Sequence, residues 1–458
     1  MTTNAINLIY LLSIVLFMLG IKYLSSPATA RRGNEISMVG MATAMAATLA
    51  SPSITSFPLI IIGIVVGSAI GAVTAVRVAM TSMPEMVALF NGCGGAASAL
   101  VALAEFQRAE TPFAPFALVT LLLSIIIGAV TFTGSLIAFG KLQGLVPSRP
   151  IVYRGQQVVN GLLLLVTLAM AVMVYQDQAG TLFFYGIVVL SLVLGVLAVI
   201  PIGGADMPVI ISLLNSYSGV AVSMTGFALS NNALIIVGSL VGASGLFLTQ
   251  IMCAAMNRSL ANVLFGAFGA VQETAASGEG PGGSIRGYEV EDVATVLENA
   301  ASLIIVPGYG LAAAQAQHIT KELAEHLSDK GVLVRYAIHP VAGRMPGHMN
   351  VLLAEADVSY DQLFSMDDIN ADFARTDAVL VIGANDVVNP AAKTNPQSPI
   401  YGMPVLNVEE AKTVIVLKRS MNVGFAGIEN ELFYRDNTMM LFGDAKKSLH
   451  ALLQHLKG

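Results

Sequence analysis

The sequence has 458 residues, 55% of them hydrophobic and only 11% charged, with a formal net charge of −6 at pH 7. Residues 1–254 hold 14 of the 52 Asp, Glu, Lys and Arg residues, so the first part is too apolar for a soluble domain, whereas the rest has an ordinary soluble composition. The soluble part carries 15 basic against 23 acidic residues, which argues against nucleic-acid binding.

Nine apolar segments precede residue 255, and most of them reach the ~20 residues that a helical membrane span requires. They lie at about 4–24, 34–50, 57–76, 84–104, 116–140, 158–175, 182–200, 207–230 and 233–254. The second segment is marginal, because it is rich in Ala, Met and Thr rather than Leu. The sequence therefore predicts a polytopic α-helical membrane domain of about nine spans over residues 1–258.

Basic residues between the segments predict how the chain is oriented in the membrane. With the N-terminus outside, the outer loops contain only Arg108, whereas eight basic residues fall on the inner side: Lys22, Arg31, Arg32, Arg77, Lys141, Arg149, Arg154 and Arg258. This asymmetry predicts that the soluble part lies in the cytoplasm. The alternative is a cleaved signal peptide ending at Ala30, but no basic residue precedes its apolar run.

Composition changes again between the two parts of the chain. Residues 277–287 contain five glycines and a proline, which predicts a flexible linker within 259–285. Beyond it, apolar runs alternate with helical segments. Strands are expected at 303–306, 332–338, 378–382, 404–406 and 413–417, and helices at 291–300, from the turn after the first strand to about 330, and at 444–456. This alternation predicts a Rossmann-like α/β domain over residues 286–458, with a parallel sheet covered by helices on both faces.

The first expected strand runs into the turn Gly308-Tyr309-Gly310 and then into an alanine-rich helix. Such a turn lets backbone N–H groups approach a pyrophosphate at the start of a helix. Ala313 replaces the third glycine of G-x-G-x-x-G and is small enough for close packing. This pattern alone fits an ordinary strand–helix turn equally well.

The charges around the expected sheet favour NADP over NAD. No acidic residue lies in the 334–340 region, where an NAD-preferring fold would hold the ribose 2′-OH. Instead, Lys418, Arg419 and Ser420 directly follow a strand. Two cations and a hydroxyl at the carboxyl edge of a sheet suit the dianionic 2′-phosphate of NADP. A solvated basic loop is the alternative interpretation.

Further motifs follow in order along the chain: Gly308–Gln317, His339–Asn350, Gly383–Pro390, Lys418–Ser420 and Gly424–Asn430, with Gly203–Pro208 and Asn215–Ser218 in the membrane part. Together they closely resemble the beta subunit of the proton-translocating NAD(P) transhydrogenase. The resemblance implies that hydride transfer between NADH and NADP⁺ is coupled to proton translocation across the bacterial inner membrane. It implies that this chain binds NADP(H), and that a separate alpha subunit brings the NAD(H)-binding domain and further membrane helices to a dimeric complex.

The same resemblance assigns the site residues position by position. It gives the nucleotide turn to Gly308, Tyr309 and Gly310, the lining of the nucleotide to Val341, Gly343 and Arg344, and the 2′-phosphate to Lys418, Arg419 and Ser420. It places Gly383, Asn385 and Asp386 near the cofactor, with Asp386 implicated in coupling. Gly424, Phe425 and Ala426 would belong to a loop that folds over NADP(H) as a lid. The family usually has Tyr where this chain has Phe425, so a hydroxyl contact is missing. No metal site is expected.

Three residues of the membrane part are candidates for a proton path. Many relatives carry a histidine at the position of Asn91, which cannot titrate, and all six histidines of this chain lie at or beyond His318. For relatives that carry Asn at this position, as this chain does, the resemblance implies that an alpha-subunit helix supplies the ionisable group. Asp206 is functional by default, because acids at membrane depth are costly, although it could instead cap the helix that follows. Asn215, more than two turns deeper, could orient water.

A nucleotide-gated ion channel or transporter with a Rossmann sensor domain is the rival interpretation. The run Val306–Gly310 is similar to part of a potassium filter. It lies in the soluble part between a strand and a helix, however, and the sequence shows no comparable loop that re-enters the membrane.

Overall fold

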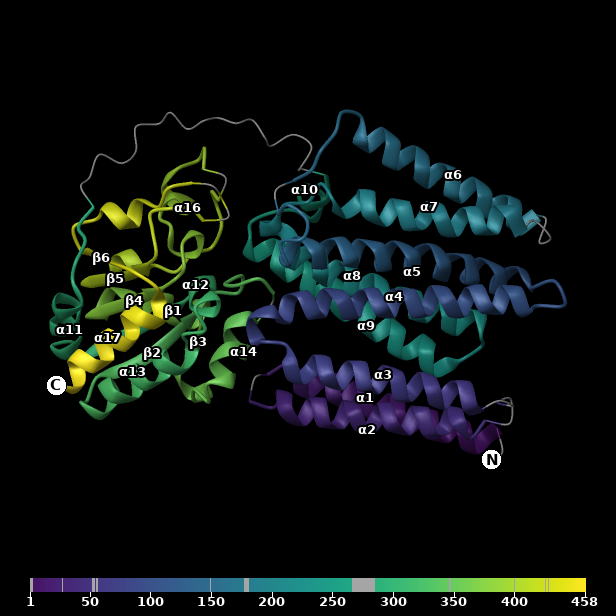
Figure 1. Ribbon diagram of the computed structural model, residues 1–458, viewed down its shortest axis with the longest axis horizontal. Helices are drawn as coiled ribbons and strands as arrows, with labels where there is room; N and C mark the ends of the chain where they lie inside the picture. The colour runs from purple at the N-terminus through teal and green to yellow at the C-terminus, as the bar shows by residue number, and fades with distance from the viewer. Residues whose placement is uncertain are drawn as a thin grey trace. The chain divides into compact units, whose positions relative to one another are not determined.

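The computed structural model describes residues 3–26, 28–51, 54, 57–148, 150–176, 181–265, 285–345, 347–398, 400–424, 426 and 428–458 (Figure 1). The chain divides into two compact units. The first comprises Met1–Val146, Ile151–Ile200 and Ile211–Phe247, and the second Pro147–Pro150, Pro201–Ile210 and Leu248–Gly458. Of the expected linker 259–285, residues 266–284 lie outside the described residues.

All nine apolar segments of the sequence form helices. They are α1 (Thr3–Leu24), α2 (Ala30–Leu49), α3 (Phe57–Arg77), α4 (Met83–Arg108), α5 (Pro115–Leu142), α6 (Gln156–Gln176), α7 (Thr181–Val199), α8 (Met207–Ala228) and α9 (Asn232–Ala255), followed by the short α10 (Leu260–Phe265). Among the described residues, eight helices are long and apolar enough to cross a membrane. The exception is α2, the marginal second segment, which carries Arg31, Arg32 and Glu35. The chain is therefore a multi-pass membrane protein.

Small residues allow the membrane helices to pack closely. A Cβ atom added to Gly95 of α4 would lie 2.7 Å from the carbonyl oxygen of Gly128 on α5. Between α8 and α9, a Cβ on Gly238 would lie 2.7 Å from the carbonyl oxygen of Gly219. Side chains at these positions would force the backbones apart, so the glycines fix the helix spacing.

The second unit is built on a six-stranded sheet whose order is β3-β2-β1-β4-β5-β6. All five pairings are parallel. The strands are β1 (Ser302–Pro307), β2 (Leu333–Ile338), β3 (Leu363–Ser365), β4 (Ala378–Ile382), β5 (Thr413–Lys418) and β6 (Thr438–Phe442). This order reverses between β1 and β4, and α/β sheets bind ligands outside the carboxyl ends of the strands at such a switch point. The predicted Rossmann-like fold is confirmed.

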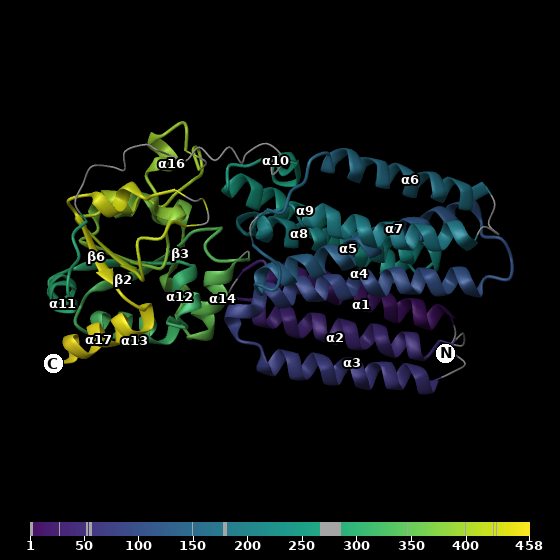
Figure 2. The ribbon, with the colours of Figure 1, turned by 45° about the horizontal axis from the view of Figure 1, so that its top comes forward.

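Helices and short turns cover both faces of the sheet. Helices α11 (Val290–Glu298), α13 (Gln317–Asp329) and α17 (Ala445–Lys457) lie together on one side (Figure 2). Against the other face, strand residues such as Val306 and Val381 pack with Phe373, Leu406 and Phe433 in one core. The remaining helices are α12 (Tyr309–Ala313), α14 (His348–Glu355), α15 (Met366–Ile369) and α16 (Ala391–Thr394), and the 3₁₀ turns are η4 (Tyr360–Gln362), η5 (Asn370–Arg375), η6 (Asp386–Val388), η7 (Val408–Glu410) and η8 (Glu431–Tyr434).

Three expectations about the elements were wrong. The expected strand at 404–406 is an extended connection that joins no strand ladder; its Leu406 N–H donates to the Val387 carbonyl. The sheet instead gains β3, which has only three residues, and the Met-rich β6. The helix expected after the glycine turn is divided into α12 and α13, because Gln315 adopts a left-handed conformation with φ +49°.

The entry to the α/β domain is tied to its last strand. Tyr288 donates its N–H to the Met440 carbonyl at 2.9 Å, and Met440 donates to the Arg286 carbonyl at 3.1 Å. Gly287 thereby forms a parallel bridge with Met440. Residues 286–288 therefore continue the sheet beyond β6.

Candidate functional site

Two turns meet at the carboxyl ends of β1 and β4. The N–H of Gly308 donates to the Ile382 carbonyl and that of Gly310 to the Gly383 carbonyl, both at 2.9 Å. A Cβ on Gly308 would lie 2.5 Å from Cα of Ala384, and one on Gly310 would lie 2.6 Å from Cα of Gly383. Glycine is required here because the two backbones are in contact.

This contact changes the expected role of the glycine turn. The N–H groups of Gly308 and Gly310 are already bonded to carbonyl oxygens, so they are not available to a pyrophosphate in this conformation. Helix α12 is only five residues long, which limits its contribution to the local field. An anionic ligand at this edge would therefore depend more on side-chain cations than the glycine turn alone suggests.

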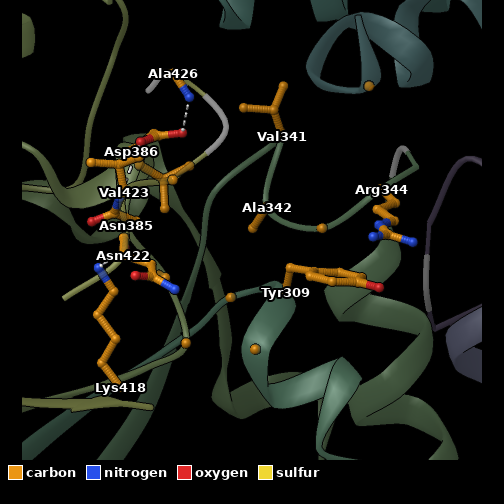
Figure 3. Close-up of a pocket in the computed structure, with 18 of the residues that line it drawn as sticks. Tyr309, Val341, Ala342, Arg344, Asn385, Asp386, Lys418, Asn422, Val423 and Ala426 are labelled. Carbon is orange, nitrogen blue, oxygen red and sulfur yellow. Dashed lines mark hydrogen bonds between the residues drawn. The ribbon is translucent and has the colours of Figure 1, made fainter. Parts of the chain in front are cut away.

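One such cation lies over the turn. The guanidinium carbon of Arg344 is 4.1 Å from the centroid of the Tyr309 ring, within cation–π range (Figure 3). Arg344 belongs to the loop after β2, together with Val341 and Gly343. Position 343 requires glycine because its φ is +104°, which other residues rarely adopt.

The start of the same loop is fixed by a buried histidine. His339 accepts the N–H of Val341 at Nδ1 (3.2 Å), and its Nε2 lies 2.8 Å from the Pro404 carbonyl oxygen. Burial lowers the pKa of His339 to about 4, against a weaker opposing effect of the Pro404 hydrogen bond. The ring is therefore neutral near pH 7 and donates from Nε2.

Further cations follow β5. Lys418 lies beside Asn422 (Figure 3) and donates from Nζ to the Asn422 carbonyl at 2.6 Å. The same nitrogen lies 4.6 Å from the Phe433 ring centroid. Burial lowers the pKa of Lys418, while the nearby negative charge of Asp386 partly opposes that effect. Arg419 and Ser420 are exposed. The three residues thus place positive charge at the carboxyl end of β5.

An acidic turn faces the segment that contains Gly424. Asp386 accepts the N–H of Ala426 at Oδ2 (3.0 Å). A Cβ on Gly424 would lie 2.6 Å from Nδ2 of Asn385, so this segment packs tightly on the turn after β4. Phe425 lies outside the described residues.

One pocket brings the predicted cofactor residues together. Fourteen of the fifteen line it, all except Phe425: Gly308, Tyr309, Gly310, Val341, Gly343, Arg344, Gly383, Asn385, Asp386, Lys418, Arg419, Ser420, Gly424 and Ala426. The sequence missed Asn422 and Val423, which also line it (Figure 3). Their position between two predicted motifs was the available signal. Asn422 contacts Lys418 through its backbone carbonyl, so the type of its side chain gave no signal.

The membrane candidates are held in different ways. Asn91 is buried on α4 and donates from Nδ2 to the Ile211 carbonyl at 3.1 Å, and its own carbonyl accepts from Ser218 (2.8 Å). Asn215 is half-buried on α8. Asp206 ends the 3₁₀ turn η2 (Gly204–Asp206), directly before α8.

Asp206 forms an ion pair. Its two carboxylate oxygens accept from Nη1 of Arg258 at 2.6 and 2.8 Å, and 15% of its side chain is exposed. An N-cap carboxylate would accept a backbone N–H at the start of the helix. Within the described part of the chain, the Asp206 carboxylate accepts none. The ion pair therefore replaces the capping contact that the sequence also allowed.

Comparisons with known proteins agree with these features. A family model described as NAD(P) transhydrogenase beta subunit matches residues 6–455. The NAD(P) transhydrogenase subunit beta of Rhodospirillum rubrum is 50% identical over 462 residues, which cover 99% of this chain and 99% of the relative. The subunit from a named strain of that species gives the same values. The filter-like run Val306–Gly310 lies in β1 and the turn to α12, and no finding favours a channel.

Proposed function

The chain belongs to the NAD(P) transhydrogenase beta-subunit family, and we propose that its α/β domain is the NADP(H)-binding part of the complex. A beta subunit implies an alpha-subunit partner. We assign the NAD(H)-binding domain and additional membrane helices to that partner, and a dimer to the whole complex. We place the complex in the bacterial inner membrane, with the N-terminus outside and the α/β domain in the cytoplasm, an orientation that requires α2 to be a ninth span.

The preference for NADP(H) rests on one observation. Lys418, Arg419 and Ser420 line the same pocket as the glycine turn and Arg344. The extra group of NADP is a dianionic phosphate, and charge-assisted hydrogen bonds to cations are stronger than those between neutral groups. Gly308 and Gly383 keep the turns after β1 and β4 in backbone contact, which brings the glycine turn and these cations to the same edge of the sheet. The residues present therefore fit a phosphorylated dinucleotide.

Bound NADP(H) would supply the nicotinamide that gives or takes the hydride. The chain's own residues bind and orient it. Tyr309 and Arg344 would hold the nucleotide at the end of β1, and the residues after β5 would fix the phosphate. The Gly424–Ala426 segment, held by Asp386, would cover the site and exclude water. Because Asp386 ties this segment to the turn after β4, it would influence how fast NADP(H) is released.

For the membrane part, we propose that Asp206 exchanges protons at the cytoplasmic end of α8. Arg258 holds the carboxylate at this position through two hydrogen bonds from Nη1. Asn91 and Asn215 cannot titrate, and they would orient water along the path. The ionisable group beside Asn91 would then come from the partner. One charge that crosses 100 mV is worth about 2.3 kcal/mol, which is enough to shift the relative affinity for NADP⁺ and NADPH by about 1.7 decades.

Nucleotide titration of a fragment spanning residues 285–458 tests the cofactor assignment. The fragment contains all six strands and the core, so it should fold without the membrane helices. We expect calorimetry to show NADPH binding at least about tenfold tighter than NADH, given the charge-assisted bonds to the phosphate. Equal affinities would reject the assignment of the 2′-phosphate to this pocket.

A further inference from the structure

A second histidine lies beneath the loop after β2. His348 is the first residue of α14 and is completely buried. Its Nδ1 accepts the backbone N–H of Arg344 at 3.0 Å. An imidazole nitrogen that accepts carries no proton, so the ring is neutral with its hydrogen on Nε2. Burial, reinforced by the charge of Arg344, lowers the pKa of His348 to about 4, which agrees with this tautomer.

His348 carries a cost that an apolar residue would avoid. Its Nε2 has no hydrogen-bond partner among the described residues. A buried polar group without a partner is destabilising. Packing alone would therefore favour Leu or Phe at this position. The hydrogen bond that Nδ1 accepts from the Arg344 N–H is the contact that those residues could not make.

The bond to Arg344 belongs to a layered arrangement. The His348 ring lies 6.4 Å from the Tyr309 ring, centroid to centroid, with 50° between the planes. The Arg344 guanidinium lies over the same tyrosine (Figure 3). His348 thus fixes the backbone of Arg344 while Tyr309 supports its side chain. A Cβ on Gly343 would lie 2.5 Å from Nδ1 of His348, so the loop lies directly on the ring.

We propose that His348 is a positioning residue for nucleotide binding: its neutral Nδ1 holds Arg344 on Tyr309, with the guanidinium ready for a phosphate of the dinucleotide. This inference rests on the proposed function of the pocket. A free arginine side chain loses considerable rotamer entropy when a ligand fixes it. Holding it in place before binding removes part of that loss. The glycine N–H groups are already bonded, which makes the placement of this cation more important.

Four variants in the full-length chain, assembled with its partner in membrane vesicles, test the proposal. His348→Asn keeps an acceptor oxygen near the Nδ1 position, whereas His348→Phe keeps a ring without the acceptor. Arg344→Ala removes the cation. His326→Asn is the control, because His326 bonds to the Leu456 carbonyl and does not line the pocket. The dissociation constant of NADPH is measured by fluorescence, together with KM for each nucleotide and the unfolding temperature.

We expect His348→Phe to raise the NADPH dissociation constant about tenfold, as the loss of one good hydrogen bond would, while His348→Asn stays within about threefold of the parent. KM for NAD(H) should not change. In the Arg344→Ala background, His348→Phe should have little further effect, because both substitutions remove the same interaction. A merely structural histidine predicts the opposite: additive losses, and a parallel decrease in unfolding temperature. That result would overturn the inference.

The binding measurements distinguish a wrong proposed function from a wrong role for His348, and a further variant is available if His348→Phe does not fold. If the parent protein does not bind NADPH, the proposed function is wrong; if it binds and His348→Phe binds equally well, only the role of His348 is wrong. Should His348→Phe fail to accumulate, His348→Gln replaces it, because its amide reaches the Nε2 position instead of the Nδ1 position. Binding by the Gln variant that equals binding by the Asn variant would then contradict the proposal.

Discussion

The backbone N–H of Ala426 donates to Oδ2 of Asp386 across 40 positions of sequence. This bond joins the glycine-containing segment after β5 to the turn after β4. Removal of the acceptor should free the segment, so Asp386→Ala should accelerate NADP(H) release about tenfold. Asp386→Asn retains an oxygen acceptor and should change release much less. Stopped-flow displacement of bound NADPH measures both release rates. An unchanged rate in the Ala variant would show that the bond between Asp386 and Ala426 does not control release.

The cations after β5 should discriminate between the two dinucleotides. Replacement of Lys418 and Arg419 by Ala should weaken NADP(H) binding by several kcal/mol, at ~1.5–3 kcal/mol for each charge-assisted bond. NAD(H) binding should change far less. Lys412→Ala is a matched control, because this lysine precedes the same strand at its other end and pairs with Asp377. Calorimetric losses of equal size for both nucleotides would count against the phosphate site.

Gly308→Ala should disrupt the contact between the two turns. Its Cβ would meet backbone atoms of Ala384, which cannot move as a flexible side chain can. We expect the free energy of unfolding to decrease by about 1–3 kcal/mol and NADPH binding to be lost. Gly331→Ala is the comparison, because Gly331 has φ +91° with nothing within 4 Å. Chemical denaturation should show a cost of about 1–2 kcal/mol there from backbone strain, with NADPH affinity unchanged.

His339 should make the stability of the α/β domain depend on pH. Its pKa is about 4 in the folded chain against 6.5 for the unfolded one, so the unfolded state binds a proton first as the pH falls. The contribution of neutral His339 to the free energy of unfolding is fully present above about pH 6.5. It is lost as the pH falls from there to about 4, by at most about 3 kcal/mol. Denaturation of the 285–458 fragment across this range measures the loss. His339→Gln keeps a donor for the Pro404 carbonyl and should reduce the slope, and the remaining slope comes from His348, whose pKa is also lowered to about 4. An unchanged slope would exclude His339 as a cause.

Variants of the ion pair between Asp206 and Arg258 test whether Asp206 carries protons or serves the structure only. Asp206→Asn should severely slow proton-coupled turnover, because the amide cannot carry a proton. Hydride exchange between bound NADP(H) and NAD(H) analogues needs no proton transfer and should survive. Arg258→Gln removes the partner cation, and we expect it to slow coupled turnover as well, because the carboxylate loses the contact that holds it in place. Vesicle acidification reports both effects. Pumping by the Asn variant at the parental rate would place the proton path elsewhere.

Patterns that repeat along the chain made most of the fold predictable. Long apolar runs identified the membrane helices, and buried apolar runs beside Gly308 and Gly383 identified β1 and β4. Short or atypical elements were missed: β3 has three residues, and Met439 and Met440 give β6 little strand character. Pro404 interrupts an apolar run that otherwise resembles a strand, because proline cannot donate to a ladder.

The candidate pocket was predictable residue by residue only where motifs exist. Sequence could not reveal that the N–H groups of Gly308 and Gly310 are already bonded, because that depends on how closely the turn after β4 approaches. The same limit hid His348. Its role depends on a bond to the backbone of Arg344, and a backbone bond leaves no trace in the identity of the residue that donates it.

The bridge between Gly287 and Met440 has a mechanical consequence. Any tension on the chain that enters the domain at residue 285 is borne first by two hydrogen bonds to Met440, before it can reach the interior of the sheet. Strand β6 pairs with β5 from Thr438 to Phe442, and Lys418 is the β5 residue opposite Phe442. A pull on the chain at residue 285 would therefore load β6, beside the cationic end of β5, whereas β1 and its glycine turn lie three strands away from β6.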